Sequence, residues 1–534
     1  MRKHSLWIAA ELFLAVAASV AAQDTNIPHL EKQGTAMQLV VDGKPFLILA
    51  GEIHNSSSSN LDYMKPIWPR LAEIPLNTVL TPISWELIEP SEGKYDFTLV
   101  DGLLQQARQN KLHIVFLWLA SWKNGMSSYA PLWVKQDTRR FPRVVEDGNE
   151  VEILSTLGTA TRDADAKGFA AVMRHLREVD GQEHTVLMMQ VENEVGVLGD
   201  TRDHSAAANK AFGSAIPHEL TAYLEQHRST LYPELRELWE GNGAKTAGTW
   251  TEVFGNTPGA DEIFMAWNYG RYVNHVAAAG KAEYPLPMYV NTWLAYEDAN
   301  PGTYPSGGPQ PRVIDIWKAA GSAIDIYAPD IYQTNFEEWC KRYTQGGRPL
   351  FIPEATGGSA GEQNVFYAIG QHDALGFSPF AIDSAKDPKS DLGNSYQVLQ
   401  QLSPLILQHR GKGEMAGFLL DKQKSSTAFV MNGYLVSVSL DEIFGFGAEK
   451  AFGLIIATGA NEFMGAGRGF RVKFAARSAG PSHAGIGYAE EGSFENGTWR
   501  AGRRLNGDEN DQGHYWRFSP QSKSIEKVLV YRFE

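Results

Sequence analysis

The sequence predicts a (β/α)8 barrel followed by an antiparallel β domain. Three observations carry this prediction: short apolar runs recur between residues 46 and 382, longer helix-like segments separate them, and the pattern changes after about residue 411. Continuous apolar strands separated by helices indicate a parallel sheet that is buried on both faces. Eight such runs, the number that closes a barrel, are FLILAGEI (46–53), NTVLTPI (77–83), HIVFLWLA (113–120), TVLMMQV (185–191), PMYVNTW (287–293), IDIYAPDI (324–331), PLFIPEA (349–355) and ALGFSPFAI (374–382).

The segments between the runs have the residue pattern of helices. LVDGLLQQARQNK (99–111) and AKGFAAVMRHLREVD (166–180) place apolar residues at helical spacing. The stretch 200–280 is longer than a barrel connection requires, so it predicts an additional helical insertion. SYQVLQQLSPLILQHRG (395–411) predicts the eighth helix of the barrel, which ends at Gly411.

From about residue 415 the chain alternates short apolar strands with turns. This pattern is typical of an antiparallel β domain, most often a sandwich. We therefore divide the chain into a leader over residues 1–22, a catalytic barrel over 23–411 and a C-terminal β domain over 412–534.

The first 22 residues have the pattern of a secretory signal. Arg2 and Lys3 precede an apolar stretch, and Val20, Ala21 and Ala22 form a small-residue cleavage pattern. No later segment reaches the ~20 apolar residues that span a bilayer. The sequence thus predicts an exported protein without a membrane span, located in the periplasm or outside the cell.

Composition excludes several classes of partner. The 534 residues include 48 basic and 62 acidic side chains, a net charge of −14, which argues against a general nucleic-acid or anionic-membrane partner. Cys340 is the single cysteine, so no intramolecular disulfide can form. Because no HExxH or comparable ligand cluster occurs, we expect neither a metal nor a cofactor. The oligomeric state is not encoded in any pattern that we recognise.

Acidic residues follow two of the predicted strands, at the end where barrels carry their active sites. Glu192, Asn193 and Glu194 come after the fourth run, and Glu354 lies at the end of the seventh. Two carboxyl groups at one barrel mouth are the minimal equipment for cutting a glycosidic bond, since one protonates the leaving oxygen while the other attacks the sugar. Strand alternation turns Glu192 and Glu194 the same way, so periodicity leaves both as candidates.

Other polar and aromatic residues near the predicted mouth are candidates for binding substrate. Aromatic rings can stack on the apolar face of a sugar, and amide, ammonium or carboxylate groups can bind its hydroxyls. For each of them a packing or loop-ordering role is the alternative. The candidates are Trp122, Trp293, Tyr332, Lys123, Asn124 and Glu86.

Four motifs make the prediction more specific. GEIHNSS (51–57), TVLTPISWELIEPSEGKYDF (78–97), QVENEVG (190–196) and PEATGG (353–358) resemble segments of glycoside hydrolase family 35, the β-galactosidases, and the resemblance covers residues 35–410. The Asn-Glu pair after the fourth strand and a second Glu after the seventh are the pattern of the larger retaining clan. The chain departs from typical members at three positions, where Asn55, Pro82 and Ser121 replace Tyr, Tyr and Glu.

The resemblance assigns roles to these residues. It implies that Glu194 is the acid/base and Glu354 the nucleophile, that Asn193 binds the sugar 2-hydroxyl, and that Tyr332 holds the nucleophile's carboxylate. Glu192 is then a structural residue. The pKa of Glu194 should be raised by burial and by its negative neighbour.

The implied activity is exo-acting, retaining release of terminal β-galactose from an oligosaccharide or polysaccharide, including xyloglucan side chains. Two alternatives stay open: a retaining hydrolase for another terminal β-sugar, such as glucosamine or arabinose, and a non-catalytic sugar-binding barrel. Retention requires the two carboxyl groups to lie about 5–5.5 Å apart.

Overall fold

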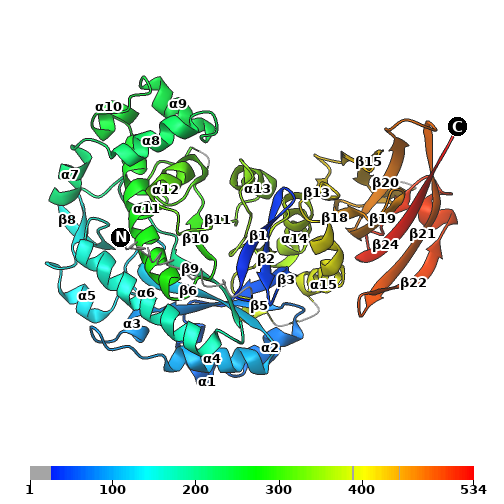
Figure 1. Ribbon diagram of the computed structural model, residues 1–534. Coiled ribbons are helices and arrows are strands. Elements are labelled where there is room, and N and C mark those ends of the chain that lie inside the picture. The colour runs from blue at the N-terminus through cyan, green and yellow to red at the C-terminus, as the bar shows by residue number, and fades with distance from the viewer. Residues whose placement is uncertain (1–25, 297, 386, 388–389, 444–445) are drawn as a thin grey trace, which may run out of the picture.

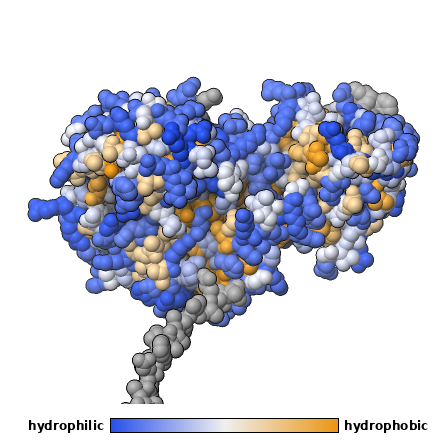
Figure 2. Space-filling model, turned by 45° about the horizontal axis from the view of Figure 1, so that its top comes forward, coloured by the Kyte–Doolittle hydropathy of each residue, from blue (hydrophilic) through white to orange (hydrophobic). Residues whose placement is uncertain are grey.

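The computed structural model describes residues 26–534 except 297, 386, 388–389 and 444–445. The leader expected over residues 1–22 lies outside the described residues. Figure 1 shows a helix-covered barrel with a second, β-rich part beside it, which holds the C-terminus. Within the described ranges, no helix is both long and apolar enough to cross a membrane. Hydrophilic residues cover most of the face shown in Figure 2, over both parts.

The predicted barrel is confirmed. One parallel sheet has the strand order β12-β4-β5-β6-β9-β10-β11. The seventh predicted run closes the ring between β11 and β12, because Ala355 bridges Ile331 and Ile352 bridges Phe377. The strands are β4 (Ile48–Glu52), β5 (Thr78–Ser84), β6 (His113–Lys123), β9 (Val186–Asn193), β10 (Met288–Trp293), β11 (Ile326–Asp330) and β12 (Gly376–Phe377).

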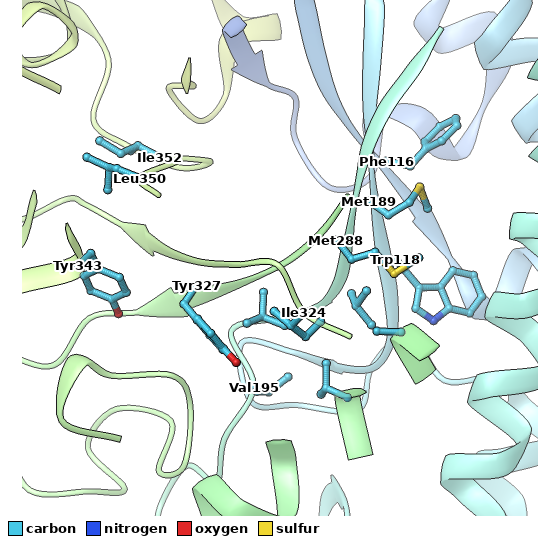
Figure 3. Close-up of a cluster of buried hydrophobic side chains, with 14 of the residues drawn as sticks. Phe116, Trp118, Met189, Val195, Met288, Ile324, Tyr327, Tyr343, Leu350 and Ile352 are labelled. Atoms are coloured by element: carbon cyan, nitrogen blue, oxygen red, sulfur yellow. The ribbon is translucent and has the colours of Figure 1, made fainter. Parts of the chain in front are cut away.

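Strand alternation separates an inner core from an outer one. Side chains such as Leu117 of β6 and Tyr289 of β10 fill the barrel interior. The alternate positions face outward, and Figure 3 shows Phe116, Trp118 and Met189 lying together on this outer side. The N-terminal end of the barrel is covered by a small antiparallel sheet of β1 (His29–Gln33), β2 (Ala36–Val41) and β3 (Lys44–Phe46).

Helices surround the sheet, and the expected insertion between β9 and β10 is present as α7 to α10, followed by the long α11. A short antiparallel ribbon of β7 (Arg143–Glu146) and β8 (Asn149–Leu154) follows β6. The helices are α1 (Leu61–Met64), α2 (Ile67–Glu73), α3 (Trp85–Ile88), α4 (Thr98–Gln109), α5 (Leu132–Gln136), α6 (Thr159–Asp180), α7 (Ala206–Phe212), α8 (His218–His227), α9 (Pro233–Gly241), α10 (Trp250–Phe254), α11 (Pro258–Glu283), α12 (Ile314–Ala320), α13 (Phe336–Thr344), α14 (Gly358–His372) and α15 (Asp391–His409).

The C-terminal part is antiparallel, as predicted. A six-stranded sheet, β13-β18-β19-β24-β21-β22, faces a four-stranded sheet, β14-β15-β20-β23, across a separate buried core. The expected boundary at residue 411 falls between the end of α15 and the start of β13. The strands are β13 (Met415–Asp421), β14 (Ser426–Met431), β15 (Tyr434–Leu440), β16 (Glu442–Ile443), β17 (Phe446–Gly447), β18 (Lys450–Ala457), β19 (Glu462–Arg468), β20 (Phe470–Ala476), β21 (His483–Glu495), β22 (Thr498–Leu505), β23 (Trp516–Arg517) and β24 (Ser524–Phe533).

The six-stranded sheet packs against α14 and α15 of the barrel (Figure 1). Phe452 of β18 meets Phe366 of α14 with ring centroids 5.3 Å apart, and both belong to the barrel's outer core. The backbones approach closely here, since a Cβ on Gly370 would lie 3.0 Å from the Cα of Gly417. The fully buried Glu362 of α14 pairs with two cations of the C-terminal part, Arg468 and Lys523. The contact therefore combines apolar packing with a buried ionic link.

Replacing Glu362 with glutamine should lower the free energy of unfolding by about 3 kcal/mol, because it leaves two cations at a buried contact without their anion. The surface pair of Lys424 with Glu337 also links the barrel to the C-terminal part, and it provides the matched control. Glu337→Gln should cost less than about 1 kcal/mol. The denaturant midpoints of both variants test this prediction. Equal losses of unfolding free energy would show that the buried ion pairs contribute no more stability than the surface pair.

Candidate active site

Three carboxyl groups meet at the carboxyl ends of the barrel strands. Glu194 follows β9, Asp330 ends β11, and Glu354 lies in the segment between β11 and β12. One carboxylate oxygen of each lies within 4.8 Å of those of the other two, and all three residues are buried. Glu194 and Glu354 are thus close enough together for both carboxyl groups to act on one glycosidic bond.

The end of β9 departs from regular strand geometry. Glu192 and Glu194 have φ angles of 61° and 44°, in the left-handed region that side chains other than glycine rarely adopt. Glu192 consequently turns toward β6, where it accepts hydrogen bonds from the backbone N–H of Ser121 (3.2 Å) and Trp122 (2.8 Å). The expectation from alternation, that Glu192 and Glu194 point the same way, is wrong. Glu192 fixes the irregular end of β6, and Glu194 joins the carboxyl cluster.

Hydrogen-bond donors surround the carboxylate of Glu354. The hydroxyl of Tyr332 donates to Oε2 at 2.8 Å. The side-chain amides of Asn291 and Asn193 donate to Oε1 at 3.3 and 3.4 Å. Donors of this kind fix the orientation of a carboxylate, as nucleophilic attack requires.

Asn291 of β10 ties the cluster together, and the sequence did not single it out. Its Oδ1 accepts the backbone N–H of Glu194 at 2.9 Å, and its Nδ2 donates to Asp330 at 2.8 Å as well as to Glu354. The available signal was an amide near the carboxyl end of the run PMYVNTW (287–293). A buried polar group in such a run needs a partner, and the barrel mouth supplies it.

Burial and the neighbouring Glu354 raise the pKa of Glu194 from 4.5 to about 7, partly offset by Lys123 and by a hydrogen bond from Asp330. A carboxyl group with this pKa keeps a proton close to neutral pH, as a general acid must. The site thus holds Glu194, which is suited to donating a proton, beside Glu354, whose carboxylate accepts several hydrogen bonds.

Lys123 is the last residue of β6. Its positive charge lowers the pKa of Glu194. Burial opposes its charge, but Glu354, Glu194, Glu52 and Asp330 together raise its pKa, so it stays an ammonium. In the described part of the chain, no carboxylate oxygen forms an ion pair with it. The role of Lys123 in binding a sugar hydroxyl stays a prediction.

Asn124 lies in the turn after Lys123, with a φ of 51°. Its backbone N–H donates to the backbone carbonyl of Asn193 at 3.2 Å. The backbone N–H of Gly125 donates to the backbone carbonyl of Glu194 at 3.0 Å. The backbone of this turn is pinned to the end of β9 next to the carboxyl cluster. Whether the side chain of Asn124 binds a hydroxyl or orders its loop stays a prediction.

The prediction that Trp122 forms a sugar platform is wrong. Its side chain is fully buried, with the rings of Tyr269 and Tyr272 at 4.9 and 4.5 Å and its Nε1 donating to the carbonyl of Leu154. The physical reason is the irregular end of β6, where Glu192 binds the backbone N–H of Trp122. Trp293, in contrast, is only half-buried at the end of β10.

Glu86 lines a neighbouring cavity of about 330 Å³ instead of the carboxyl cluster. Asn55 and Tyr129 line the same cavity, and the backbone N–H of Glu86 donates to the carbonyl of Tyr129 at 3.1 Å. Glu194 and Glu354 are not among its lining residues. Glu86 therefore lies beside the candidate active site, on its β5 side.

The three clustered carboxyl oxygens are close enough to ligate a cation. An ion there would occupy the lone pairs of both Glu194 and Glu354, and the ammonium of Lys123 opposes it electrostatically. The expectation that no metal is used stays a prediction.

Two parts of the chain match family models. Residues 62–261 match a model described as "Beta-galactosidase" (Glyco_hydro_42), and residues 392–517 match a "Domain of unknown function (DUF5597)". A β-galactosidase from Xanthomonas manihotis is 30% identical over 215 residues, which are 38% of this chain and 32% of the relative. The chain therefore spans about a third of the curated relative that it matches.

Solved structures show a similar but distant barrel. The cold-adapted β-galactosidase from Rahnella sp. R3 is 15% identical, with a TM-score of 0.46 over 70% of this chain and 58% of its own. The β-galactosidase from Bacillus circulans sp. alkalophilus is 14% identical, with a TM-score of 0.47 over 69% and 58%. The endo-1,4-β-mannanase from Rhizomucor miehei is 12% identical, with a TM-score of 0.43 over 70% and 99%.

Residues 62–261 of the barrel thus match a glycoside hydrolase domain of the β-galactosidase type. The matching model is that of family 42, whereas the sequence motifs resemble family 35. Membership of family 35 is therefore not confirmed, and the matches support only the broader likeness of residues 62–261 to β-galactosidase-type hydrolases.

Proposed function

We propose that the chain is an exo-acting, retaining β-galactosidase, with Glu194 as the acid/base and Glu354 as the nucleophile. The observation that carries the proposal is the pair itself: their carboxylate oxygens lie within 4.8 Å, and the pKa of Glu194 is about 7. Only 6% of Glu194 and 5% of Glu354 is exposed, so both carboxyl groups are largely shielded from bulk water.

In the first step Glu354 attacks the anomeric carbon while Glu194 gives its proton to the glycosidic oxygen, so that the bond to the aglycone breaks as the glycosyl ester forms. The donors from Tyr332, Asn291 and Asn193 hold the attacking carboxylate in place. In the second step Glu194, now ionised, takes a proton from water, whose oxygen attacks the anomeric carbon and releases Glu354.

Galactose is the proposed sugar because the matched family model and the curated relative both bear the name β-galactosidase. Side chains of a polysaccharide such as xyloglucan are the proposed source, and the leader pattern in the sequence supports an exported enzyme, in the periplasm or outside the cell. The family 35 motifs support membership of that family.

The purified chain, tested on a panel of nitrophenyl glycosides, should cleave the β-galactoside fastest, with the β-glucosaminide and β-arabinoside far slower. Glu354→Ala is the matched inactive control, which reveals any contaminating activity. Preference for a different β-sugar would replace galactose in the proposal. Absence of cleavage across the panel, with sugars still binding, would favour the non-catalytic sugar-binding barrel.

Activity should fall as the pH rises through about 7. The raised pKa means that Glu194 is protonated below that value and loses its proton above it, so the general acid disappears on the alkaline side. The measurement is kcat/KM for an unactivated β-galactoside against pH, with structural integrity checked at each pH. A profile that stays flat well into the alkaline range would remove Glu194 from the role of acid.

A further inference from the structure

Asp330 is a third carboxyl group in the site, and the two-glutamate mechanism does not use it. It is 1% exposed, its Oδ2 accepts from Nδ2 of Asn291 at 2.8 Å, and one of its carboxyl oxygens lies within 4.8 Å of a carboxyl oxygen of Glu194. Within the described residues, its Oδ1 finds no hydrogen-bond donor. A hydrogen bond between two carboxyl groups requires a proton on one of them.

Several charged and titratable groups face Asp330 from the surrounding strands. Burial, followed by Glu354 and Glu194, raises its pKa well above the ordinary value. Three ionised carboxylates within 4.8 Å of one another would repel strongly in a buried site. The groups around it are Glu194, Glu354, Glu52, Lys123, Tyr289, Tyr332 and Tyr343.

We propose that Asp330 is a positioning residue that stays protonated through the reaction and donates a hydrogen bond to the carboxylate of Glu194 whenever Glu194 has lost its proton. The inference rests on the proposed function and deepens it. After the first step Glu194 is an anion and Glu354 is a neutral ester, so the proton on Asp330 stabilises and aims the base that must activate water. The hydrogen bond from Asp330 lowers the pKa of Glu194, which keeps Glu194 ionised at the start of this second step.

Two substitutions separate this role from a purely structural one. Asp330→Asn keeps an oxygen for Asn291 and gains an N–H for Glu194, so it imitates the protonated side chain. It should retain kcat within about threefold and leave the alkaline limb of kcat/KM in place. Asp330→Ala removes the donor, so the pKa of Glu194 should rise, moving the alkaline limb up by about one pH unit, while kcat falls about tenfold or more.

The matched control is Asp180→Asn, at the end of α6. Asp180 is fully buried, pairs with Arg108 and accepts two backbone N–H bonds at the far end of the barrel. This variant should lose stability without moving either limb of the pH profile. If Asp330→Asn instead moved the alkaline limb to lower pH, Asp330 would be an anion, and the inference would be overturned. An unchanged pH profile in Asp330→Ala would also overturn the inference, because it would leave Asp330 with a packing role only.

Infrared difference spectra of the substrate-free protein give a second readout that does not need turnover. At neutral pH, wild type minus Asp330→Asn should show the loss of one protonated carboxyl band. Loss of an ionised carboxylate band would overturn the inference even if the enzyme is fully active. An inactive wild type with the protonated band present would instead count against the proposed function alone.

Discussion

Glu354→Ala should lower kcat for nitrophenyl β-galactoside by about 10⁵-fold or more, because no glycosyl-enzyme can form without the attacking carboxylate. The fold should survive, since Glu354 is held by side-chain donors at the mouth and contributes nothing to the apolar cores. Thermal unfolding and circular dichroism check that the variant is folded.

Rescue of Glu354→Ala by azide, a small external nucleophile, tests whether the missing carboxylate is the nucleophile. Azide can enter the space left in Glu354→Ala and attack the anomeric carbon directly, giving an α-galactosyl azide from an activated substrate. Glu362→Gln, which changes a buried glutamate at the contact between the two parts, is the control and should keep its turnover well below its unfolding temperature. Substantial activity in Glu354→Ala without azide would exclude Glu354 as the nucleophile.

Glu194→Ala should show a loss that depends on the leaving group. Without the general acid, substrates with poor leaving groups should lose about 10³–10⁴-fold in kcat/KM. Dinitrophenyl glycosides, whose leaving group needs no proton, should form the glycosyl-enzyme almost normally and then stall. Rates of both steps are measurable by stopped-flow release of the phenol.

Azide again provides the diagnostic result. In Glu194→Ala it should accelerate the second step and give a β-galactosyl azide, since it replaces the water that Glu194 activates. Glu192→Gln is the matched comparison, because Glu192 interacts with the backbone of β6 and with Asp165 and is not a member of the carboxyl cluster. It should lower stability without this dependence on the leaving group. An equal loss for all leaving groups in Glu194→Ala would contradict its role as the acid.

The barrel was predictable because eight continuous apolar runs are typical of strands that are buried on both faces of a parallel sheet. The seventh run was counted as a strand, and in the structure it closes the ring through Ile352 and Ala355. The location of Glu194 and Glu354 followed from the same count, since parallel strands bring their carboxyl ends to one mouth.

What the sequence could not provide is the backbone conformation at the strand ends. The choice between Glu192 and Glu194 depends on left-handed φ angles, which no periodicity encodes. Trp122 was misplaced for the same reason, because its direction depends on the irregular end of β6. Asn291 could have been noticed as an amide in an apolar run, but its three partners come from distant parts of the chain.

The central claim is that Glu354 forms a covalent bond with the sugar, and trapping tests it most directly. A 2-deoxy-2-fluoro-β-galactoside with a dinitrophenyl leaving group should inactivate the wild-type enzyme. The fluorine slows both steps, whereas the activated leaving group keeps the first step fast, so the glycosyl-enzyme accumulates. Mass spectrometry of peptic fragments is expected to locate a single fluorosugar on Glu354, within the segment between β11 and β12. A label on Glu192 or Asp330, or turnover that inverts the anomeric centre without any label, would contradict the account.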